Sequence, residues 1–321
     1  MKKTALANNR PTIENFIDIK DTSEGITFDG KGYLYVTSYN NGKVLKISSD
    51  KTVSDFASGL IGPAAIAFDC NQNFYVCECG KFITLPFINL MLPVTRIPGK
   101  LTRIDPDGTK KYFLKADDER GLYGGKRTWK IKHPNGMAIK RNGVVYVSEM
   151  SGFIVRIEGD NASVLFSFSN FLPLDIGLQH SPNGMVLSKD EKFLYVNDMR
   201  SGDVWKVSLD EKGYMIGRER LPLHPKSLPQ ADGIVLDEKG YLYITYQLKD
   251  IARVAPQTGE VEDIYCDEEL NTPANIAFGY GKGFDNKSLY ITQLGLKKDL
   301  PKAKEITVIK KMYIGNSGLV P

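Results

Sequence analysis

The sequence lacks the apolar segments that a bilayer-spanning helix requires. No run approaches the roughly 18 consecutive apolar residues of a membrane span, and the first ten residues, MKKTALANNR, contain no apolar signal-peptide core. No stretch of useful length shows helical periodicity either. We therefore expect a cytoplasmic protein built from β-strands, without a transmembrane segment, unless a longer precursor has been trimmed.

Charge of one sign is also scarce. The 321 residues include 42 Lys and Arg against 38 Asp and Glu, a net charge of +4, and the two signs are interleaved along the chain. Nucleic-acid-binding proteins instead gather basic residues into a patch or stripe. The sequence thus argues against a nucleic-acid partner and is compatible with a small-molecule substrate.

Cysteines are few: Cys70, Cys77, Cys79 and Cys266. Three of them lie within ten residues of one another, and Cys77 and Cys79 alternate on one face of a predicted strand end. A metal or redox site is one interpretation of this pair. Reduced thiols packed in the interior of a cytosolic protein are the favoured one.

What the sequence does contain is one phrase repeated six times. Each copy is a short apolar strand, a polar turn and an aliphatic or aromatic strand, as in Glu24-Gly-Ile-Thr-Phe followed by Tyr33-Leu-Tyr-Val-Thr. The two closest copies begin 40 residues apart, at Glu24 and Ala64, near the period of a four-stranded propeller blade. The pattern predicts an all-β fold, a six-bladed β-propeller with four strands per blade.

The two chain ends predict how the ring closes. Residues 13–26 align without gaps on residues 53–66, with Phe16 matching Phe56, so the chain begins with the fourth strand of a blade. The last blade has a third strand within residues 305–314 and no fourth strand after it. We expect the N-terminal strand to complete that blade, with residues 1–12 as a tail and residues 13–321 as a single domain.

Loop lengths distinguish the two faces of the predicted ring. Nearly every insertion falls on connections that share one face, at residues 80–99, 116–133, 170–181 and 293–304. Long loops on a rigid scaffold usually hold the binding site. The first insertion contains a strongly apolar stretch, residues 82–94, interpreted as a loop packed onto its neighbours, a lid over an apolar substrate, a membrane-docking element or a dimer contact.

The first residues of the six copies are expected to converge at the centre of this face. They are Glu24, Ala64, Asn135, Asn183, Asp232 and Ala274. Two carboxylates and two amides would repel or remain unpaired without a cation, and oxygen donors favour a hard ion such as calcium. Asn-Gly and Asp-Gly also occur as plain turn dipeptides, but the two alanines show that the repeat itself does not demand Asn or Asp.

These residues resemble the gluconolactonase/regucalcin superfamily, six-bladed propellers that include diisopropyl-fluorophosphatase-like and paraoxonase-like hydrolases. The resemblance rests on the oxygen-donor set, on the phrase that runs from Ser181 to Asp198, and on the ending from Ile309 to Leu319. It covers essentially the whole chain from about residue 13. It implies that Glu24, Asn135, Asn183 and Asp232 bind one catalytic calcium ion, with Asp232 as general base or nucleophile in the hydrolysis of lactones or related esters.

Two motifs depart from those of sugar-lactone enzymes. Glu24 is followed by Gly-Ile-Thr-Phe where those enzymes usually have Gly-Pro-x-Trp, and residues 133–136 read His-Pro-Asn-Gly where they have an Arg-x-Pro-Asn-Asp-Gly-like phrase. These departures argue against a gluconolactone-type substrate. Phosphotriester hydrolysis at the same site, or a calcium-stabilised propeller that only binds a ligand or a protein, are the alternative functions.

Further candidates come from the ends of predicted strands and from histidines. His133 and His180 precede Asn135 and Asn183 and are candidate bases or proton shuttles; loop histidines bonded to backbone are the alternative, and His224 is expected in a surface loop. A second group of residues follows the second strands and is predicted to line the substrate pocket. This group is Glu78, Glu149, Asp198, Tyr246 and Gln293.

Overall fold

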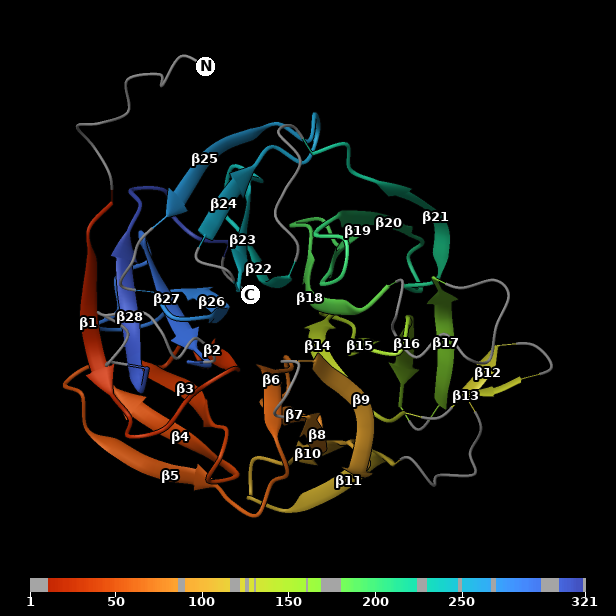
Figure 1. The fold of residues 1–321 in the computed structure, drawn as a ribbon, viewed down its shortest axis with the longest axis horizontal. Coiled ribbons are helices and arrows are strands. Elements are labelled where there is room, and N and C mark those ends of the chain that lie inside the picture. Colours follow the sequence, from red (N-terminus) through yellow and green to blue (C-terminus); the bar gives the residue numbers. More distant parts are fainter. Residues whose placement is uncertain are drawn as a thin grey trace.

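Six antiparallel sheets of four strands each stand around a central axis (Figure 1). The structure, a computed structural model, describes residues 11–85, 90–115, 122–124, 127–129, 131–159, 161–168, 180–223, 230–247, 250–266, 270–295 and 306–319. Within these ranges all regular elements are strands. The prediction of a six-bladed β-propeller is confirmed, and the described residues contain no helix long and apolar enough to cross a bilayer.

The blades follow one another along the chain, and the first strand of each lies nearest the axis. The first three blades consist of β2 (Ile26–Phe28), β3 (Tyr33–Ser38), β4 (Lys43–Ser48) and β5 (Val53–Ala57); β6 (Pro63–Phe68), β7 (Phe74–Glu78), β10 (Lys100–Ile104) and β11 (Lys110–Lys115); and β14 (Pro134–Ile139), β15 (Val145–Glu149), β16 (Phe153–Glu158) and β17 (Asn161–Ser167). The last three consist of β18 (Pro182–Leu187), β19 (Phe193–Asp198), β20 (Val204–Leu209) and β21 (Met215–Arg220); β22 (Ala231–Leu236), β23 (Leu242–Tyr246), β24 (Asp250–Val254) and β25 (Val261–Cys266); and β26 (Pro273–Phe278), β27 (Ser288–Gln293), β28 (Val308–Tyr313) and β1 (Ile13–Asp18).

The N-terminal strand closes the ring, as the alignment of the chain ends predicts. β1 pairs antiparallel with β28, from Ile13 opposite Met312 to Asp18 opposite Val308. A register shift near Phe16 accompanies edge-on packing of its ring against Tyr290, with ring centroids 5.0 Å apart. Because the last blade takes its fourth strand from the other end of the chain, no blade of the ring is left incomplete.

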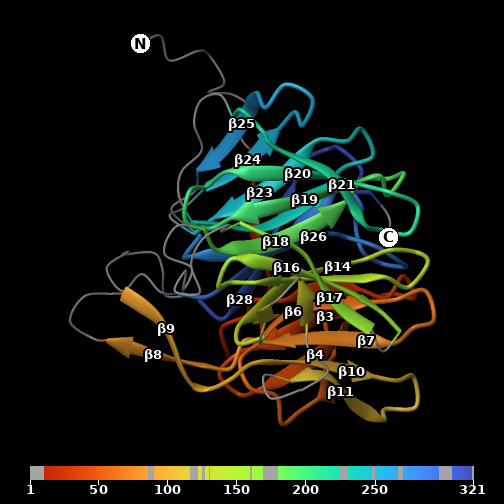
Figure 2. The same ribbon diagram turned by 90° about the vertical axis from the view of Figure 1, so that its right-hand side faces the viewer.

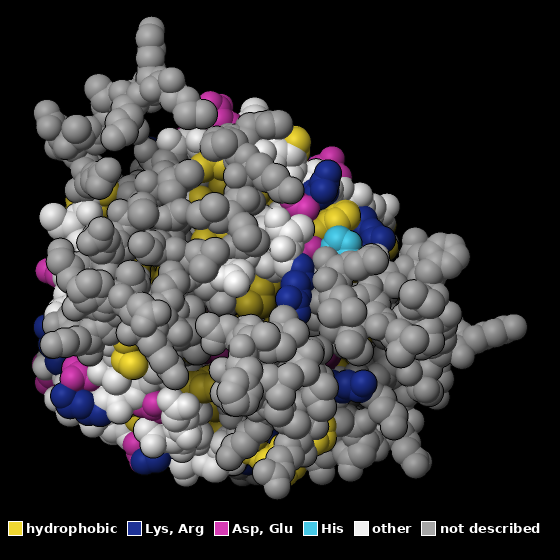
Figure 3. All heavy atoms as spheres, in the orientation of Figure 1, with side chains coloured by type: hydrophobic (Ala, Val, Ile, Leu, Met, Phe, Trp, Pro, Cys, Tyr) yellow, Lys and Arg dark blue, Asp and Glu magenta, His cyan; other side chains and the backbone are white. Residues whose placement is uncertain are grey.

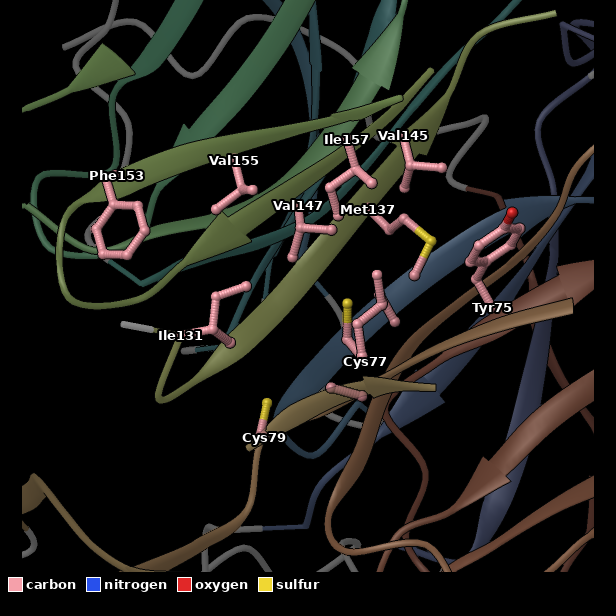
Figure 4. Packing of buried hydrophobic residues seen from close by; sticks show 13 residues of the cluster. Tyr75, Cys77, Cys79, Ile131, Met137, Val145, Val147, Phe153, Val155 and Ile157 are labelled. Atoms are coloured by element: carbon pink, nitrogen blue, oxygen red, sulfur yellow. The ribbon is translucent and has the colours of Figure 1, made fainter. Parts of the chain in front are cut away.

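Alternating apolar side chains fill the spaces between neighbouring blades. Figure 4 shows the cluster between the second and third blades, in which Cys77 and Cys79 lie among Val, Ile and Phe side chains. Both thiols are buried and free, and Cys70 is exposed; the side chain of Cys266 lies outside the described part of the structure. Cys77 and Cys79 are thus thiols packed in the interior, as the favoured interpretation predicts.

Two of the predicted insertions carry strands of their own. β8 (Lys81–Leu85) and β9 (Leu90–Ile97) form a hairpin that projects from one face of the ring, on the left of Figure 2. β12 (Leu122–Gly124) and β13 (Arg127–Trp129) form a second, shorter hairpin.

The structure describes only the backbone of most of residues 82–94, so their role as packed loop, lid, membrane contact or dimer contact stays a prediction. His224 lies outside the described residues. We call this face of the ring the loop face and the opposite one the turn face.

Candidate active site

The first residues of the repeat sit where the pairing of strands is interrupted. β14 pairs with β15 at Pro134 opposite Glu149, and the register then shifts before Met137, so Asn135 and Gly136 stand out of the ladder. Corresponding shifts occur in β6, β18, β22 and β26. Such a bulge changes the direction of a side chain, and in these blades the first residues of the repeat lie at the bulge and converge on the axis. We call this set the first ring: Glu24, Ala64, Asn135, Asn183, Asp232 and Ala274.

The glycine after a ring residue is explained by close approach of the next blade. A Cβ atom at Gly136 would lie 2.0 Å from the carbonyl oxygen of Asn183, and one at Gly184 would lie 2.2 Å from that of Asp232. Neither glycine has the left-handed φ of a turn residue. The turn-dipeptide interpretation of these Asn-Gly pairs is therefore wrong, because the glycines leave room for neighbouring backbone.

Hydroxyl side chains of the second strands fix the bulges. Thr37 Oγ1 accepts hydrogen bonds from the backbone N–H groups of Glu24 at 3.0 Å and Gly25 at 2.9 Å. In the third blade Ser148 Oγ accepts from Gly136 N at 2.7 Å. Because these hydroxyls satisfy backbone groups that the bulges free from the ladder, the first ring is held by buried hydrogen bonds.

Two carboxylates of the first ring are buried beside each other. Glu24 is 6 % exposed and Asp232 is 3 % exposed. Burial raises the pKa of Glu24 to about 8, with a contribution from the charge of Asp232 and a partial offset from a hydrogen bond with Asn135. Burial also raises the pKa of Asp232 to about 7, against hydrogen bonds from Gln247 and Asn183. The predicted quartet of Glu24, Asn135, Asn183 and Asp232 is thus brought together.

This quartet fits a hard cation. Within the described part of the chain, no Lys or Arg side chain forms an ion pair with Glu24 or Asp232. Two buried carboxylates without a positive neighbour must take up protons or a cation. Carboxylate and amide oxygens are the ligands that calcium prefers, and four of them leave about two to four positions of its usual six to eight for water or substrate.

A second set of six residues surrounds the first ring on the loop face, one position beyond the predicted pocket residues. In every blade the N–H group of this residue donates to the carbonyl oxygen two positions before the first-ring residue, for example Met150 N to His133 O at 3.2 Å. Asn135 Nδ2 lies 3.5 Å from Met150 Sδ, and Gln247 Nε2 donates to Asp232 Oδ2 at 2.7 Å. We call this set the second ring: Tyr39, Cys79, Met150, Met199, Gln247 and Leu294.

The strand-end residues predicted to line the pocket lie inside their own blades. All five are buried, and their side chains bind mostly the backbone of the segment that leads into the first strand. Glu149 Oε2 accepts from Lys132 N at 2.9 Å, and Tyr246 Oη lies 3.5 Å from Gly202 O. The other three have comparable partners: Glu78 accepts from Ile61 N, Asp198 from Ser181 N and Gln293 from Asn271 N. Their contact with substrate stays a prediction. Because side-chain direction reverses at each residue of a strand, the next residue in each blade, which belongs to the second ring, is the better candidate for contact with substrate.

The two candidate histidines have different surroundings. His133 is 1 % exposed, and its Nδ1 lies 3.3 Å from the carbonyl oxygen of Cys79. His180 keeps 28 % of its side chain exposed, and its Nδ1 lies 2.5 Å from Oδ2 of the buried Asp198. The His180 ring also stacks on Phe168, with centroids 5.3 Å apart. A carboxylate that holds one ring nitrogen orients the other one outward, so His180 is the better placed of the two to exchange protons with a ligand.

A cavity of about 600 Å³ occupies the channel on the turn side of the first ring. The first strands of all six blades line it, and Gly318 and Leu319 from the C-terminal segment contribute to its wall. The carboxylates of the first ring are not part of this wall. The candidate chemistry therefore lies at the loop-face end of the channel.

Comparison with known families agrees with this architecture and extends it. The SMP-30/Gluconolactonase/LRE-like region family model matches residues 24–295. The match covers most of the chain and begins at Glu24 of the first ring. The chain belongs to this family.

Curated relatives and solved structures are more distant. Lactonase drp35 of Staphylococcus aureus strain MW2 is 23 % identical over 225 residues, which are 69 % of this chain and 62 % of the relative, so the match spans less than two thirds of that protein. A gluconolactonase of Xanthomonas campestris aligns with a TM-score of 0.66 at 17 % identity, over 95 % of this chain and 90 % of its own. The calcium-binding protein regucalcin of Agrobacterium tumefaciens aligns with a TM-score of 0.68 at 16 % identity, over 93 % and 92 %. At these identities the solved structures show a shared fold.

Proposed function

We propose that the protein is a calcium-dependent hydrolase of lactones or related esters. The observation that carries this proposal is the first ring, where two buried carboxylates and two amides meet without a Lys or Arg partner among the described residues. Distant likeness to lactonase drp35 supports the same reaction class. Glu24, Asn135, Asn183 and Asp232 would hold the ion. When bound, calcium would supply positive charge that polarises the ester carbonyl.

Asp232 is the residue we assign to the proton transfer or to direct attack. As a base it takes a proton from water while the water oxygen bonds to the lactone carbonyl carbon; the ring C–O bond then breaks and the alkoxide takes up a proton, giving a hydroxy acid. As a nucleophile its oxygen bonds to the same carbon, the ring C–O bond breaks and the alkoxide takes up a proton; water then adds to the acyl–Asp232 carbonyl and displaces the Asp232 carboxylate, giving the same hydroxy acid. In either case the hydrogen bond from Gln247 to Oδ2 holds the Asp232 carboxylate in place.

His180 is the residue we assign to the second proton. Its contact with the buried Asp198 fixes the orientation of the ring, so that the other ring nitrogen can donate to the departing alkoxide. His133, whose Nδ1 faces backbone, is the weaker candidate for the same role.

Hydrolysis of a lactone panel with and without a chelator tests the proposal. We expect turnover in calcium, loss of turnover in chelator and its recovery on adding calcium back, and a loss of about 10²–10⁴-fold in Asp232→Asn. Full activity of Asp232→Asn would contradict the assigned mechanism. Turnover of phosphotriesters alone would favour the alternative chemistry at this site, and calcium binding without any turnover would favour a binding propeller.

A further inference from the structure

The second ring differs in chemistry from the first ring that it surrounds. Within the second ring, no side chain carries a charge at neutral pH. Burial, followed by the charge of Glu24, raises the pKa of the Cys79 thiol well above its usual range. Burial also raises the pKa of Tyr39 far above its usual value, with Cys79 and Glu24 contributing. Both groups therefore stay protonated beside the buried carboxylates.

Three sulfur side chains from consecutive blades form one arc of the second ring. Cys79 Sγ is buried and donates to Pro134 O at 2.9 Å. Met150 and Met199 are half-buried, and their Sδ atoms lie 3.5 and 3.7 Å from the amide nitrogens of Asn135 and Asn183. Thioether side chains are apolar and adapt their shape to a ligand, so Met150 and Met199 offer contact area with few hydrogen bonds, while Cys79 is packed in the core between two blades.

Polar groups of the second ring are few. Gln247 already donates to Asp232. Tyr39 is half-buried, and within the described residues its hydroxyl has no hydrogen-bond partner. From the described residues of the second ring, a ligand above the first ring thus meets one unused donor, at Tyr39, and apolar surface from Met150, Met199 and Leu294. Figure 3, which views the loop face, shows hydrophobic side chains at the surface near the centre of the ring.

We propose that the second ring selects lactones with an apolar side chain over polyhydroxylated lactones. This inference rests on the proposed hydrolase function and names its substrate class. Each hydroxyl of a sugar lactone buried against Met150, Met199 or Leu294 would lose its hydrogen bonds to water without gaining a partner, which weakens binding. An alkyl substituent buried there removes apolar area from water instead.

Two δ-lactones with the same six-membered ring provide the test. δ-Decalactone carries an alkyl chain, and glucono-δ-lactone carries hydroxyl groups. With the intact protein in calcium, we expect kcat/KM for δ-decalactone to exceed that for glucono-δ-lactone by about tenfold or more. Equal values, or a preference for glucono-δ-lactone, would overturn the inference and leave the proposed function standing. Hydrolysis of neither lactone nor of simple esters would overturn the proposed function and this inference with it.

Substitutions then assign the preference to the sulfur arc. Met150→Gln and Met199→Gln keep side-chain length and add polar atoms, and we expect them together to reduce the δ-decalactone preference by about tenfold. Met215→Gln, the same change on the half-buried outer strand β21, is the matched control and should leave the preference unchanged. Retention of the calcium-induced rise in Tm shows that the first ring is intact. An unchanged preference in the double variant with that rise retained would overturn the assignment to the second ring.

Discussion

The first and second rings occupy equivalent positions in all six blades, yet they differ in what the repeat dictates. Bulges, glycines and strand hydroxyls set the backbone of the first ring; in five blades the ring residue lies at a bulge, whereas Glu24 precedes β2, whose pairing is regular. One backbone hydrogen bond that recurs in every blade positions the second ring, and its side chains vary from Tyr39 to Leu294. Under the proposed function, the first ring carries the chemistry, and the variable side chains of the second ring determine which substrate it acts on.

Removing the Asp232 carboxylate is expected to have the largest effect. Asp232→Asn should lower kcat by about 10²–10⁴-fold, because the amide can neither accept the proton nor attack the carbonyl. Asp107→Asn, on an exposed turn of the second blade, is the matched control and should keep full activity. Steady-state hydrolysis of the preferred lactone measures both. If Asp232→Asn retained wild-type kcat, the chemical role of the first ring would be wrong.

The two candidate histidines are expected to differ in role, His180 in catalysis and His133 in stability. His180→Asn should lower kcat by about 10²-fold and flatten the alkaline limb of the pH–rate profile, because the group that must hold a proton to act as the donor is removed. His133→Asn should act on stability and leave the shape of that profile unchanged, since His133 is buried against backbone. Rate profiles between pH 5 and 9 separate the two variants. An unaltered profile in His180→Asn would remove it from the mechanism.

Filling the space between neighbouring first-ring residues should destabilise the protein. Gly136→Ala places a methyl group 2.0 Å from the carbonyl of Asn183, and the required shift should cost about 1–3 kcal/mol of unfolding free energy. Gly217→Ala on β21 is the control, because its nearest neighbour, Ser208 Cβ, is 4.0 Å away. Urea denaturation compares the two. Equal stability of both variants would mean that the first ring does not depend on the close approach of Gly136 to the carbonyl of Asn183.

The smallest expected effect is a pH dependence of stability in the metal-free protein. Glu24 and Asp232 have folded pKa values of about 8 and about 7, above the ordinary carboxylate values of 4.5 and 3.8 that apply to the unfolded chain. The folded state therefore holds more protons between about pH 4 and 8, and its stability falls as pH rises through that window. Calcium replaces those protons, so the Tm difference between calcium and chelator should widen from pH 5 to 8. A constant difference would contradict the shared burial of the two carboxylates.

The sequence predicts the ring and the quartet because both follow from the repeat. Strand alternation and the match of residues 13–26 to residues 53–66 predict six blades and their closure, and the varying first residue of each copy identifies Glu24, Asn135, Asn183 and Asp232. The second ring was not predicted, because an error of one residue at a strand end reverses the direction of the side chain. The hairpin of β18 and β19 brings the segments of His180 and Asp198 together, but the repeat pattern does not show that the imidazole turns toward that carboxylate.

The central claim is that the first ring binds one calcium ion. Isothermal titration of calcium into the metal-free protein at pH 8 tests it most directly, with Glu24→Gln as the variant and Glu211→Gln, on an exposed turn, as the matched control. We predict one site per chain in the wild type and in Glu211→Gln, and binding weakened by at least about tenfold in Glu24→Gln, because a charged oxygen ligand is lost. Absence of binding to the wild type, or equal affinity in Glu24→Gln, would contradict the claim.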